Sequence, residues 1–390
     1  MPGNSRLNQL LDECKQLSFD LEFNYAKNWK SQDSSRVLVG YLPIYIPREI
    51  IHAANGIAVG IMGTGDHKQI IKGDAYYQSY ICHLPRGVIE MGLDKNLDGF
   101  DGFLFPSTCD CIRNLSGMFK IIKRGKFQRY FDYPQNFDIA IGGLFYKELL
   151  ETVLNDVYAI NGVKVTSDRL NDSIRKYNRN RQLVEKIYEI RQQYPWRLSA
   201  VDTYYVLRAG LQMPVEHHNK ILEEVVEHIS ESYGEPMDNI RVVVSGSFCE
   251  QPPAGLIKSI EMAGCYIVDD DFMLGMRWIE GDINADTQHP LNEIVKSFIN
   301  QSCFSSVVYD IDNPKGDRLV KQVRERNADG VVFSAASFCD PALLDRPMLQ
   351  KSCDEAGIPH INFQYHENTG QFKVIKEQAG TFSDSIKLWV

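Results

Sequence analysis

Cysteine thiols are the side chains in this 390-residue chain that point most directly to chemistry. There are nine of them, an odd number: Cys14, Cys82, Cys109, Cys111, Cys249, Cys265, Cys303, Cys339 and Cys353. A disulfide framework is not expected in a chain of this length in a reducing compartment. Since the thiolate is the form that binds metals, some of these residues are candidates for a metal or redox site. The alternative for each is a buried thiol that packs as a small apolar side chain.

Three of the cysteines stand where a site can form. Cys109 and Cys339 each close a segment that opens with Asp-Gly, continues as an apolar strand and ends in Cys-Asp. Open parallel sheets build their sites in the loops beyond the carboxyl ends of such strands. Cys82 lies just before Pro85, which suits the first turn of a helix, and a helix N-terminus favours the thiolate. These three thiols are therefore candidates for one shared site.

Three thiolates far apart in the chain suit a [4Fe–4S] cluster that keeps one iron open to a non-protein ligand. A structural zinc site would take four closed ligands, and the chain contains no Cys-x-x-Cys pair. Cys111 competes with Cys109, because residues two apart in an extended loop point the same way. Cys249, after another expected strand, is a candidate neighbour of the cluster. Buried structural thiols remain the alternative to a cluster.

Short apolar runs alternate with amphipathic segments in both halves of the chain, which predicts βαβ units. Strands are expected at 36–43, 56–63, 101–105, 240–246, 264–269, 330–334 and 359–363. Helices are expected at 6–30, 47–55, 146–157, 170–192, 215–231, 253–263, 291–300, 315–327 and 341–356, and Ser199-Ala-Val-Asp202 resembles a capping box that opens a further helix.

This pattern predicts an α/β fold with two parallel-sheet domains of flavodoxin- or Rossmann-like type and a helical connecting region. The expected division is an N-terminal helix (1–34), a first α/β domain (35–144), a helical region (145–235) and a second α/β domain (236–390).

Charge and hydropathy exclude several classes of function. The net charge of −9 and the pI of about 5.6 argue against general nucleic-acid binding, which needs a basic surface. No stretch is apolar over the roughly 18–20 residues that a membrane-spanning helix needs. The N-terminus has no apolar core of a signal peptide, so a cytoplasmic location is expected.

Three segments carry a resemblance to a known family: Tyr80-Ile-Cys82, Phe105-Pro-Ser-Thr-Cys109-Asp110, and Ser337-Phe-Cys339-Asp-Pro341 with the following Cys353–Pro359. They resemble the cysteine loops of the 2-hydroxyglutaryl-CoA dehydratase component D and benzoyl-CoA reductase family, and the likeness extends over roughly residues 35–390. The resemblance implies that Cys82, Cys109 and Cys339 hold one [4Fe–4S] cluster, with Cys111 as an alternative ligand. It also implies a heterotetramer with a related sister subunit and ATP-hydrolysing iron–sulfur subunits, a ferredoxin as upstream electron donor, and an acyl-CoA substrate.

Within the family, the segments Ser245–Glu250, Asp269–Phe272, Gly370–Lys373 and Thr381–Asp384 resemble the reductase members. The activity implied is ATP-dependent reduction of the aromatic ring of benzoyl-CoA to cyclohexa-1,5-diene-1-carboxyl-CoA. ATP would be bound by partner subunits, because this chain has no Gly-x-x-x-x-Gly-Lys-Ser/Thr loop. Two alternatives are a subunit of an (R)-2-hydroxyacyl-CoA dehydratase, which is a lyase, and a non-catalytic scaffold or relay subunit.

Two charged segments allow further interpretations. Asp269-Asp-Asp271 follows an expected strand and could bind a divalent cation, or could be a solvated strand end. The segment Arg113–Arg129 has six basic residues and no acidic one. It could contact CoA phosphates or an acidic partner, or could be an ordinary solvated surface.

Overall fold

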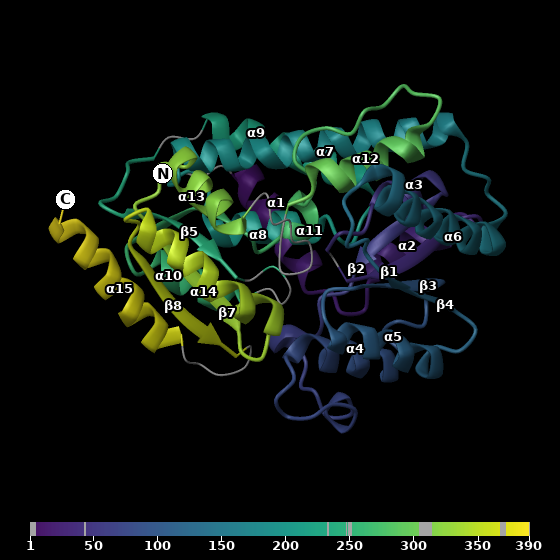
Figure 1. Ribbon diagram of the computed structural model, residues 1–390, viewed down its shortest axis with the longest axis horizontal. Coiled ribbons are helices and arrows are strands. Elements are labelled where there is room, and N and C mark those ends of the chain that lie inside the picture. Colours follow the sequence, from purple (N-terminus) through teal and green to yellow (C-terminus); the bar gives the residue numbers. More distant parts are fainter. Residues whose placement is uncertain are drawn as a thin grey trace.

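The computed structural model describes residues 5–42, 44–231, 234–246, 248, 252–303, 314–366 and 372–389. Within them lie two four-stranded sheets, and every strand pairing is parallel, which confirms the predicted fold class (Figure 1). The strands are β1 (Val37–Tyr41), β2 (Gly56–Gly60), β3 (Gly102–Pro106), β4 (Phe127–Phe131), β5 (Ile240–Ser245), β6 (Cys265–Asp270), β7 (Gly330–Ala336) and β8 (His360–Tyr365).

The two sheets have the same strand order. The first runs β2-β1-β3-β4 and the second β6-β5-β7-β8. In each sheet the second strand in the chain (β2 or β6) pairs with one side of the first strand (β1 or β5). The third and fourth strands are added on the other side of that first strand. The strand order therefore reverses between β1 and β3 in one sheet and between β5 and β7 in the other. Ligands of open parallel sheets bind beyond the carboxyl ends of the strands at such a reversal.

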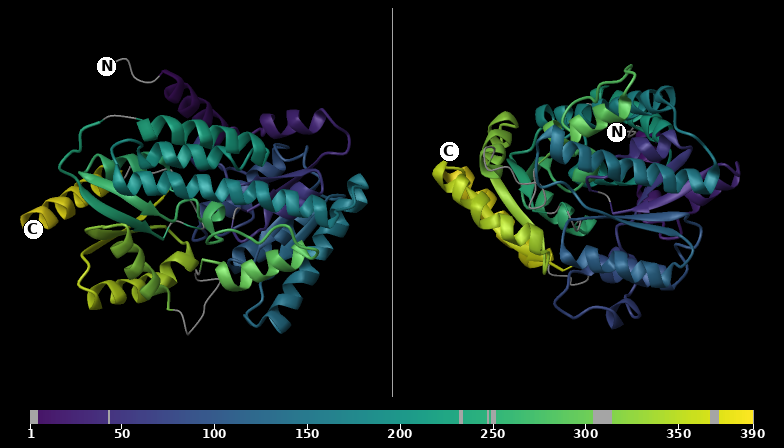
Figure 2. Two further views of the ribbon diagram at one scale, coloured as in Figure 1. Left: turned by 90° about the horizontal axis from the view of Figure 1, so that it is seen from above. Right: turned by 45° about the vertical axis from the view of Figure 1, so that its right-hand side comes forward.

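The helices surround both sheets. They are α1 (Ser5–Ser18), α2 (Asn24–Ser31), α3 (Arg48–Ala53), α4 (His83–Leu93), α5 (Asp110–Ile122), α6 (Leu144–Asn161), α7 (Ser167–Gln193), α8 (Ala200–Ala209), α9 (Val215–Glu231), α10 (Ala254–Glu261), α11 (Leu274–Arg277), α12 (Pro290–Gln301), α13 (Lys315–Glu325), α14 (Asp340–Glu355) and α15 (Phe372–Trp389). The long helices α7 and α9 lie side by side along one side of the molecule (Figures 1 and 2). Because α7 contacts both α3 and β6, it bridges the two α/β halves. The division into four sequence units stays a prediction.

Side chains of each sheet alternate between two faces, as the period of two in a strand requires. In the first sheet, Val37 and Val39 belong to a large core that continues into the second half, while Leu38 packs in a smaller core with α4 and α5. In the second sheet, Val242 and Val244 join the large core, and Val243 packs with α13 and α14. The large core holds the carboxyl edges of the two sheets close to each other.

The N-terminal region is two helices, so the prediction of one helix over 6–30 is wrong. The chain breaks after α1, and Phe23 takes a left-handed conformation with φ 55°. The Asp20 carboxylate accepts hydrogen bonds from the backbone N–H groups of Glu22 (3.0 Å) and Asn24 (2.7 Å). A short acidic side chain that bonds to nearby backbone competes with the helix, and this is why the leucine spacing overestimated the length.

Several elements are absent from the sequence-based expectations, among them the helices α5 and α11. Strand β4 lies inside the basic segment Arg113–Arg129 and extends to Phe131, and helix α15 closes the chain. The signal for α15 was present, because Ile375, Ala379, Phe382 and Ile386 are buried at helical spacing. In the part of the chain that the structure describes, no helix is both long enough and apolar enough to cross a bilayer.

The capping box before α8 is confirmed. Ser199 Oγ accepts a hydrogen bond from the backbone N–H of Asp202 (3.0 Å) and donates one to the Asp202 carboxylate (2.6 Å). We expect Ser199→Ala to lower the free energy of unfolding by about 1 kcal/mol, because an N-terminal N–H of the helix loses its partner. Urea unfolding measures this, with Ser199→Thr as the control that keeps the hydroxyl. Equal midpoints for Ser199→Ala and the wild type would contradict the assignment of the cap.

Candidate functional site

A cavity lies where loops from the carboxyl edges of both sheets meet. Its empty space, which includes some open solvent at the mouth, is about 550 Å³. Its walls come from the loops after β1, β3, β5 and β7 and from the helices α4, α5 and α14. The lining residues are Leu42, Ile44, Cys82, Leu84, Thr108, Cys109, Cys111, Ile112, Phe248, Phe338, Cys339, Asp340 and Pro341. The structure thus brings the three predicted cysteines, and the alternative Cys111, to one cavity.

Three of the four cysteines occupy the same local position. Cys82 is the N-cap residue of α4, Cys109 of α5 and Cys339 of α14, and none of these three side chains caps its own helix. Cys111 instead lies inside the first turn of α5. Helix N-termini present unpaired N–H groups and a partial positive charge, and they favour anions such as thiolates. The cavity therefore lies in front of three helix N-termini.

The four cysteines of the cavity differ in their exposure to solvent, and Cys109 and Cys111 differ in the pKa of their thiols. The side chains of Cys82 and Cys339 are buried, while Cys109 and Cys111 are half-buried. A hydrogen bond from the Cys111 thiol, supported by the backbone N–H groups of Ile112 and Cys111 and by the Thr108 hydroxyl, lowers the pKa of Cys109 to about 7 although burial opposes this. The same hydrogen bond, together with burial, raises the pKa of Cys111.

Apart from the cysteines, the lining is almost entirely apolar. Leu42, Ile44, Leu84, Ile112 and Phe248 are each at most 6% exposed. Thr108 and Asp340 are the lining residues with a hydroxyl or a carboxylate. Such a wall limits the access of water to whatever the thiols bind.

A single metal ion and an iron–sulfur cluster need different arrangements of cysteine ligands. Among the residues that the structure describes, no three His, Cys, Asp or Glu side chains lie close enough together to hold a single ion. A tetrahedral ion with metal–sulfur bonds of about 2.3 Å would need its sulfur ligands roughly 4 Å apart. An iron–sulfur cluster is larger than one ion and is held by cysteine thiolates around it. Four cysteine thiols around one largely apolar cavity are donors of the kind that an iron–sulfur cluster takes.

The other cysteines that the structure describes do not line this cavity. Cys14, Cys265 and Cys353 are buried in the cores, and burial raises the pKa of each thiol. Cys303 is also buried, and its sulfur accepts a hydrogen bond from the Arg318 guanidinium at 2.8 Å. The interpretation of Cys14, Cys265 and Cys353 as packing residues fits their positions. Cys249, the candidate neighbour of the cluster, is outside the described residues.

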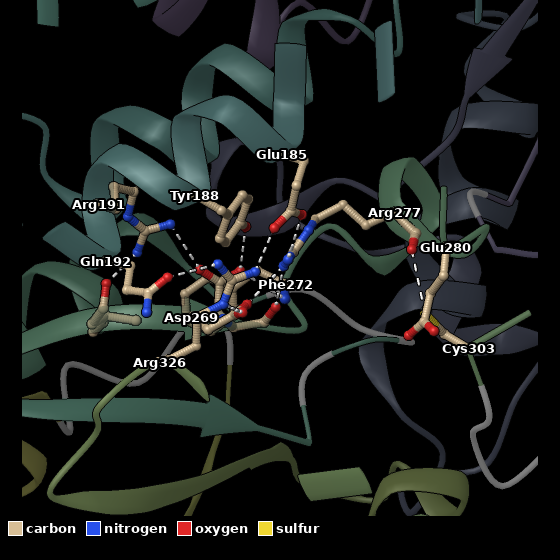
Figure 3. A network of polar contacts seen from close by, with 12 residues as sticks. Glu185, Tyr188, Arg191, Gln192, Asp269, Phe272, Arg277, Glu280, Cys303 and Arg326 are labelled. Atoms are coloured by element: carbon tan, nitrogen blue, oxygen red, sulfur yellow. Dashed lines mark hydrogen bonds and ion pairs between the residues drawn. The ribbon is translucent and has the colours of Figure 1, made fainter. Parts of the chain in front are cut away.

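The aspartates that end β6, Asp269 and Asp270, form neither a cation site nor a solvated strand end, so both interpretations are wrong for these two residues. Asp269 is 1% exposed, and its carboxylate pairs with Arg277 (2.7 Å) and Arg326 (2.7 Å). Asp270 is 5% exposed and pairs with Arg191 at 3.1 Å. Figure 3 shows Asp269 of β6 with Arg277 of α11 and Arg326 from the end of α13. The carboxylates neutralise buried guanidinium groups instead of binding a metal.

The basic segment Arg113–Arg129 has less free charge than its sequence suggests. Lys123 pairs with Asp98, and Arg129 pairs with both carboxylate oxygens of Asp156. The Arg113 guanidinium lies 3.5 Å from the carboxylate of Asp110, in the next turn of the same helix. Half of the six basic residues thus have an acidic partner, which weakens the case for a strongly cationic docking surface.

Comparison with known proteins identifies the family. Residues 43–386 match the sequence profile of 2-hydroxyglutaryl-CoA dehydratase, D-component. The chain belongs to this family. It is 48% identical over 381 residues, 97% of this chain and 98% of the relative, to the C-type subunit of benzoyl-CoA reductase from Thauera aromatica. It is 27% identical over 384 residues (97% and 100%) to the beta subunit of (R)-2-hydroxyglutaryl-CoA dehydratase of Acidaminococcus fermentans. It is 24% identical over 355 residues (91% and 93%) to the (R)-phenyllactyl-CoA dehydratase beta subunit of Clostridium sporogenes.

These relatives confirm the family predicted from the three cysteine segments. All three are subunits of enzymes whose names contain an acyl-CoA, and the one with the highest identity of the three is an oxidoreductase subunit. Each likeness covers at least nine-tenths of both chains. Membership of the 2-hydroxyglutaryl-CoA dehydratase D-component family is therefore a property of the whole chain, and it supports a role as one subunit of a heteromer.

Proposed function

We propose that this chain is the iron–sulfur C-type subunit of an ATP-dependent benzoyl-CoA reductase. The observation that carries the proposal is the convergence of Cys82, Cys109 and Cys339, each the N-cap of a different helix, on one apolar cavity. The 48% identity to the C-type subunit of a benzoyl-CoA reductase, over nearly the whole chain, supports the choice of enzyme.

In this proposal the thiolates of Cys82, Cys109 and Cys339 hold one [4Fe–4S] cluster. The cluster supplies one-electron transfer at low potential. The three helix N-termini stabilise the negative charge of the thiolates. The Thr108 hydroxyl donates to the sulfur of Cys109, and hydrogen bonds to cysteine sulfur tune the reduction potential of such sites. The apolar lining keeps water away, which limits stray protonation.

The reaction adds two electrons and two protons to the ring of benzoyl-CoA and gives cyclohexa-1,5-diene-1-carboxyl-CoA. A ferredoxin is the electron source, and two ATP-hydrolysing iron–sulfur subunits raise the driving force of the transfer. With a sister subunit related to this chain, these partners complete a cytoplasmic heterotetramer. The role of this chain in the complex is to bind the cluster that takes up the electrons and to exclude water from it near the acyl-CoA.

A lyase is the second candidate function, because the chain is also 24% and 27% identical to two dehydratase beta subunits over nine-tenths of its length or more. The two functions separate in one assay. The complex, purified without oxygen with all its subunits, is given ATP, reduced ferredoxin and either benzoyl-CoA or an (R)-2-hydroxyacyl-CoA. We expect consumption of benzoyl-CoA with formation of the diene. If the complex converts only the hydroxyacyl-CoA, the proposed reductase activity is wrong and the chain is a dehydratase subunit. If it converts neither substrate and this chain carries no cluster, the result favours a non-catalytic scaffold subunit.

The choice between Cys109 and Cys111 gives a separate prediction. We expect Cys109→Ser to lose the bound iron and Cys111→Ser to keep it, because Cys109 alone shares the N-cap position of Cys82 and Cys339. Iron and acid-labile sulfide per chain measure the difference. The two variants are matched controls, since both thiols are half-buried and lie on the same helix turn. The opposite result would make Cys111 the ligand.

A further inference from the structure

Phe338 is an aromatic residue in a backbone conformation that glycine usually takes. Its φ is 65°. The N–H of Cys339 donates to the carbonyl of Ala336 at 3.1 Å, and this closes a four-residue turn with Phe338 in the third position. A positive φ at that position of a turn is normally supplied by glycine or asparagine. For a side chain with a Cβ the left-handed region is unfavourable, and such residues gather at functional sites.

Burial does not explain why the aromatic ring is kept in this turn. The Phe338 side chain is 45% exposed, so only part of its apolar surface is removed from water. Its described ring contact is with His366, at 6.0 Å between ring centroids. A glycine in its place would relieve the backbone, although it would lose the buried half of the ring surface. The position therefore favours a role for the ring other than stability.

The Phe338 side chain reaches both the cavity wall and solvent. Phe338 lines the cavity, and it is the exposed member of an apolar lining whose other side chains are buried. Its neighbour Cys339 is only 3% exposed although it lies in the same loop. Removing the ring would open this side of the cavity next to the thiol.

We propose that Phe338 is a shielding residue, whose ring closes the solvent side of the cysteine cavity and keeps water and dissolved oxidants from what the thiols bind. The strained turn holds the ring over the opening. The nature of the bound group rests on the proposed function, but the shielding of the Cys339 thiol does not. The two parts can therefore be tested separately.

The test compares Phe338→Gly with Lys95→Gly in the full-length chain. Lys95 is an exposed residue with φ 68° outside the cavity, so both substitutions relieve a left-handed backbone and only the first removes the ring. We expect Lys95→Gly to unfold at no lower urea concentration than the wild type, whereas Phe338→Gly also loses the buried half of the ring; urea unfolding of both variants shows that each remains folded. In the cluster-free protein, we expect alkylation of Cys339 by iodoacetamide to become faster on the order of tenfold in Phe338→Gly and to be unchanged in Lys95→Gly, because thiol reactivity follows exposure.

Reconstituted protein gives the second readout. After addition of air-saturated buffer, we expect the visible absorbance of Phe338→Gly to fade several-fold faster than that of the wild type. Phe338→Leu, which keeps an apolar cover, should stay within about twofold of the wild type in both experiments. An unchanged alkylation rate in Phe338→Gly would overturn the shield whatever the protein binds. A wild-type chain that takes up no iron would instead contradict the proposed function, and the alkylation experiment would still decide on the shield.

Discussion

Replacing Cys82 by serine is expected to remove the bound iron and to abolish ring reduction. We expect iron and acid-labile sulfide to fall from about four of each per chain to less than one, since a serine hydroxyl is a poor substitute for a thiolate. Turnover of benzoyl-CoA by the assembled complex should fall on the order of 100-fold or more, because loss of a ligand should cost at least as much as loss of its supporting contacts. The change is small in volume, so the N-terminus of α4 should keep its place.

A matched control separates ligation from folding. Cys14 is buried in α1 and packs in the large core away from the cavity. We expect Cys14→Ala to keep the full iron content. Circular dichroism and urea unfolding of both variants show whether the chain remains folded. Full iron in Cys82→Ser, or an equal loss in both variants, would be incompatible with Cys82 as a ligand.

Replacing Asp269 by alanine is expected to give a large loss of stability. Its carboxylate is buried and pairs with Arg277 and Arg326, and Glu185 contacts the same two guanidinium groups from α7 (Figure 3). Without Asp269, the two mostly buried guanidinium groups keep only the half-exposed carboxylate of Glu185 as an acidic partner. Because breaking a buried ion pair costs up to about 3–5 kcal/mol, we expect a loss of a few kcal/mol. The change should appear as a lower midpoint of urea unfolding.

Asp172 provides the control for this experiment. Its side chain is 50% exposed and pairs with Lys176 and Arg175 on the helix surface. Because exposed ion pairs contribute little, Asp172→Ala should change the free energy of unfolding by less than about 1 kcal/mol. Similar losses for both variants would mean that the Asp269 network is no more important than a surface pair.

The same network predicts how stability depends on pH. Although burial opposes ionisation, Arg277 and Arg326 hold the pKa of Asp269 well below its usual range. The folded-state pKa is therefore lower than the unfolded value of about 3.9. The stabilisation is present above that value and is lost as the pH falls towards the folded-state pKa. Below about pH 4, Asp269→Ala should lose stability less steeply than the wild type, and parallel acid-unfolding curves would contradict this.

The cavity could be predicted from the sequence because its determinants are local. The Asp-Gly, apolar strand and Cys-Asp pattern recurs before Cys109 and Cys339, and parallel strands bring their carboxyl ends to one edge. Pro85 marked the helix that follows Cys82. The sequence could not distinguish Cys109 from Cys111, because that choice depends on the residue at which α5 begins.

Other features depend on partners far apart in the chain. The residues that pair with Asp269 and Asp270 lie on α7, α11 and beyond α13, so a run of three aspartates looked like an exposed strand end or a cation site. Strand β4 begins in a basic segment, and its Arg129 pairs with Asp156 on α6, a contact that no local pattern reveals. The left-handed turn at Phe338 was also hidden, since an aromatic residue in that position does not indicate a positive φ.

The location of iron in the intact complex tests the central claim most directly. Crystals grown without oxygen, with diffraction recorded on both sides of the iron absorption edge, locate iron atoms independently of any assumption about ligands. The proposal predicts one compact group of iron atoms on this chain, bonded to the sulfur atoms of Cys82, Cys109 and Cys339, in the cavity behind Phe338. Iron elsewhere on this chain, or none on it, would contradict the proposal.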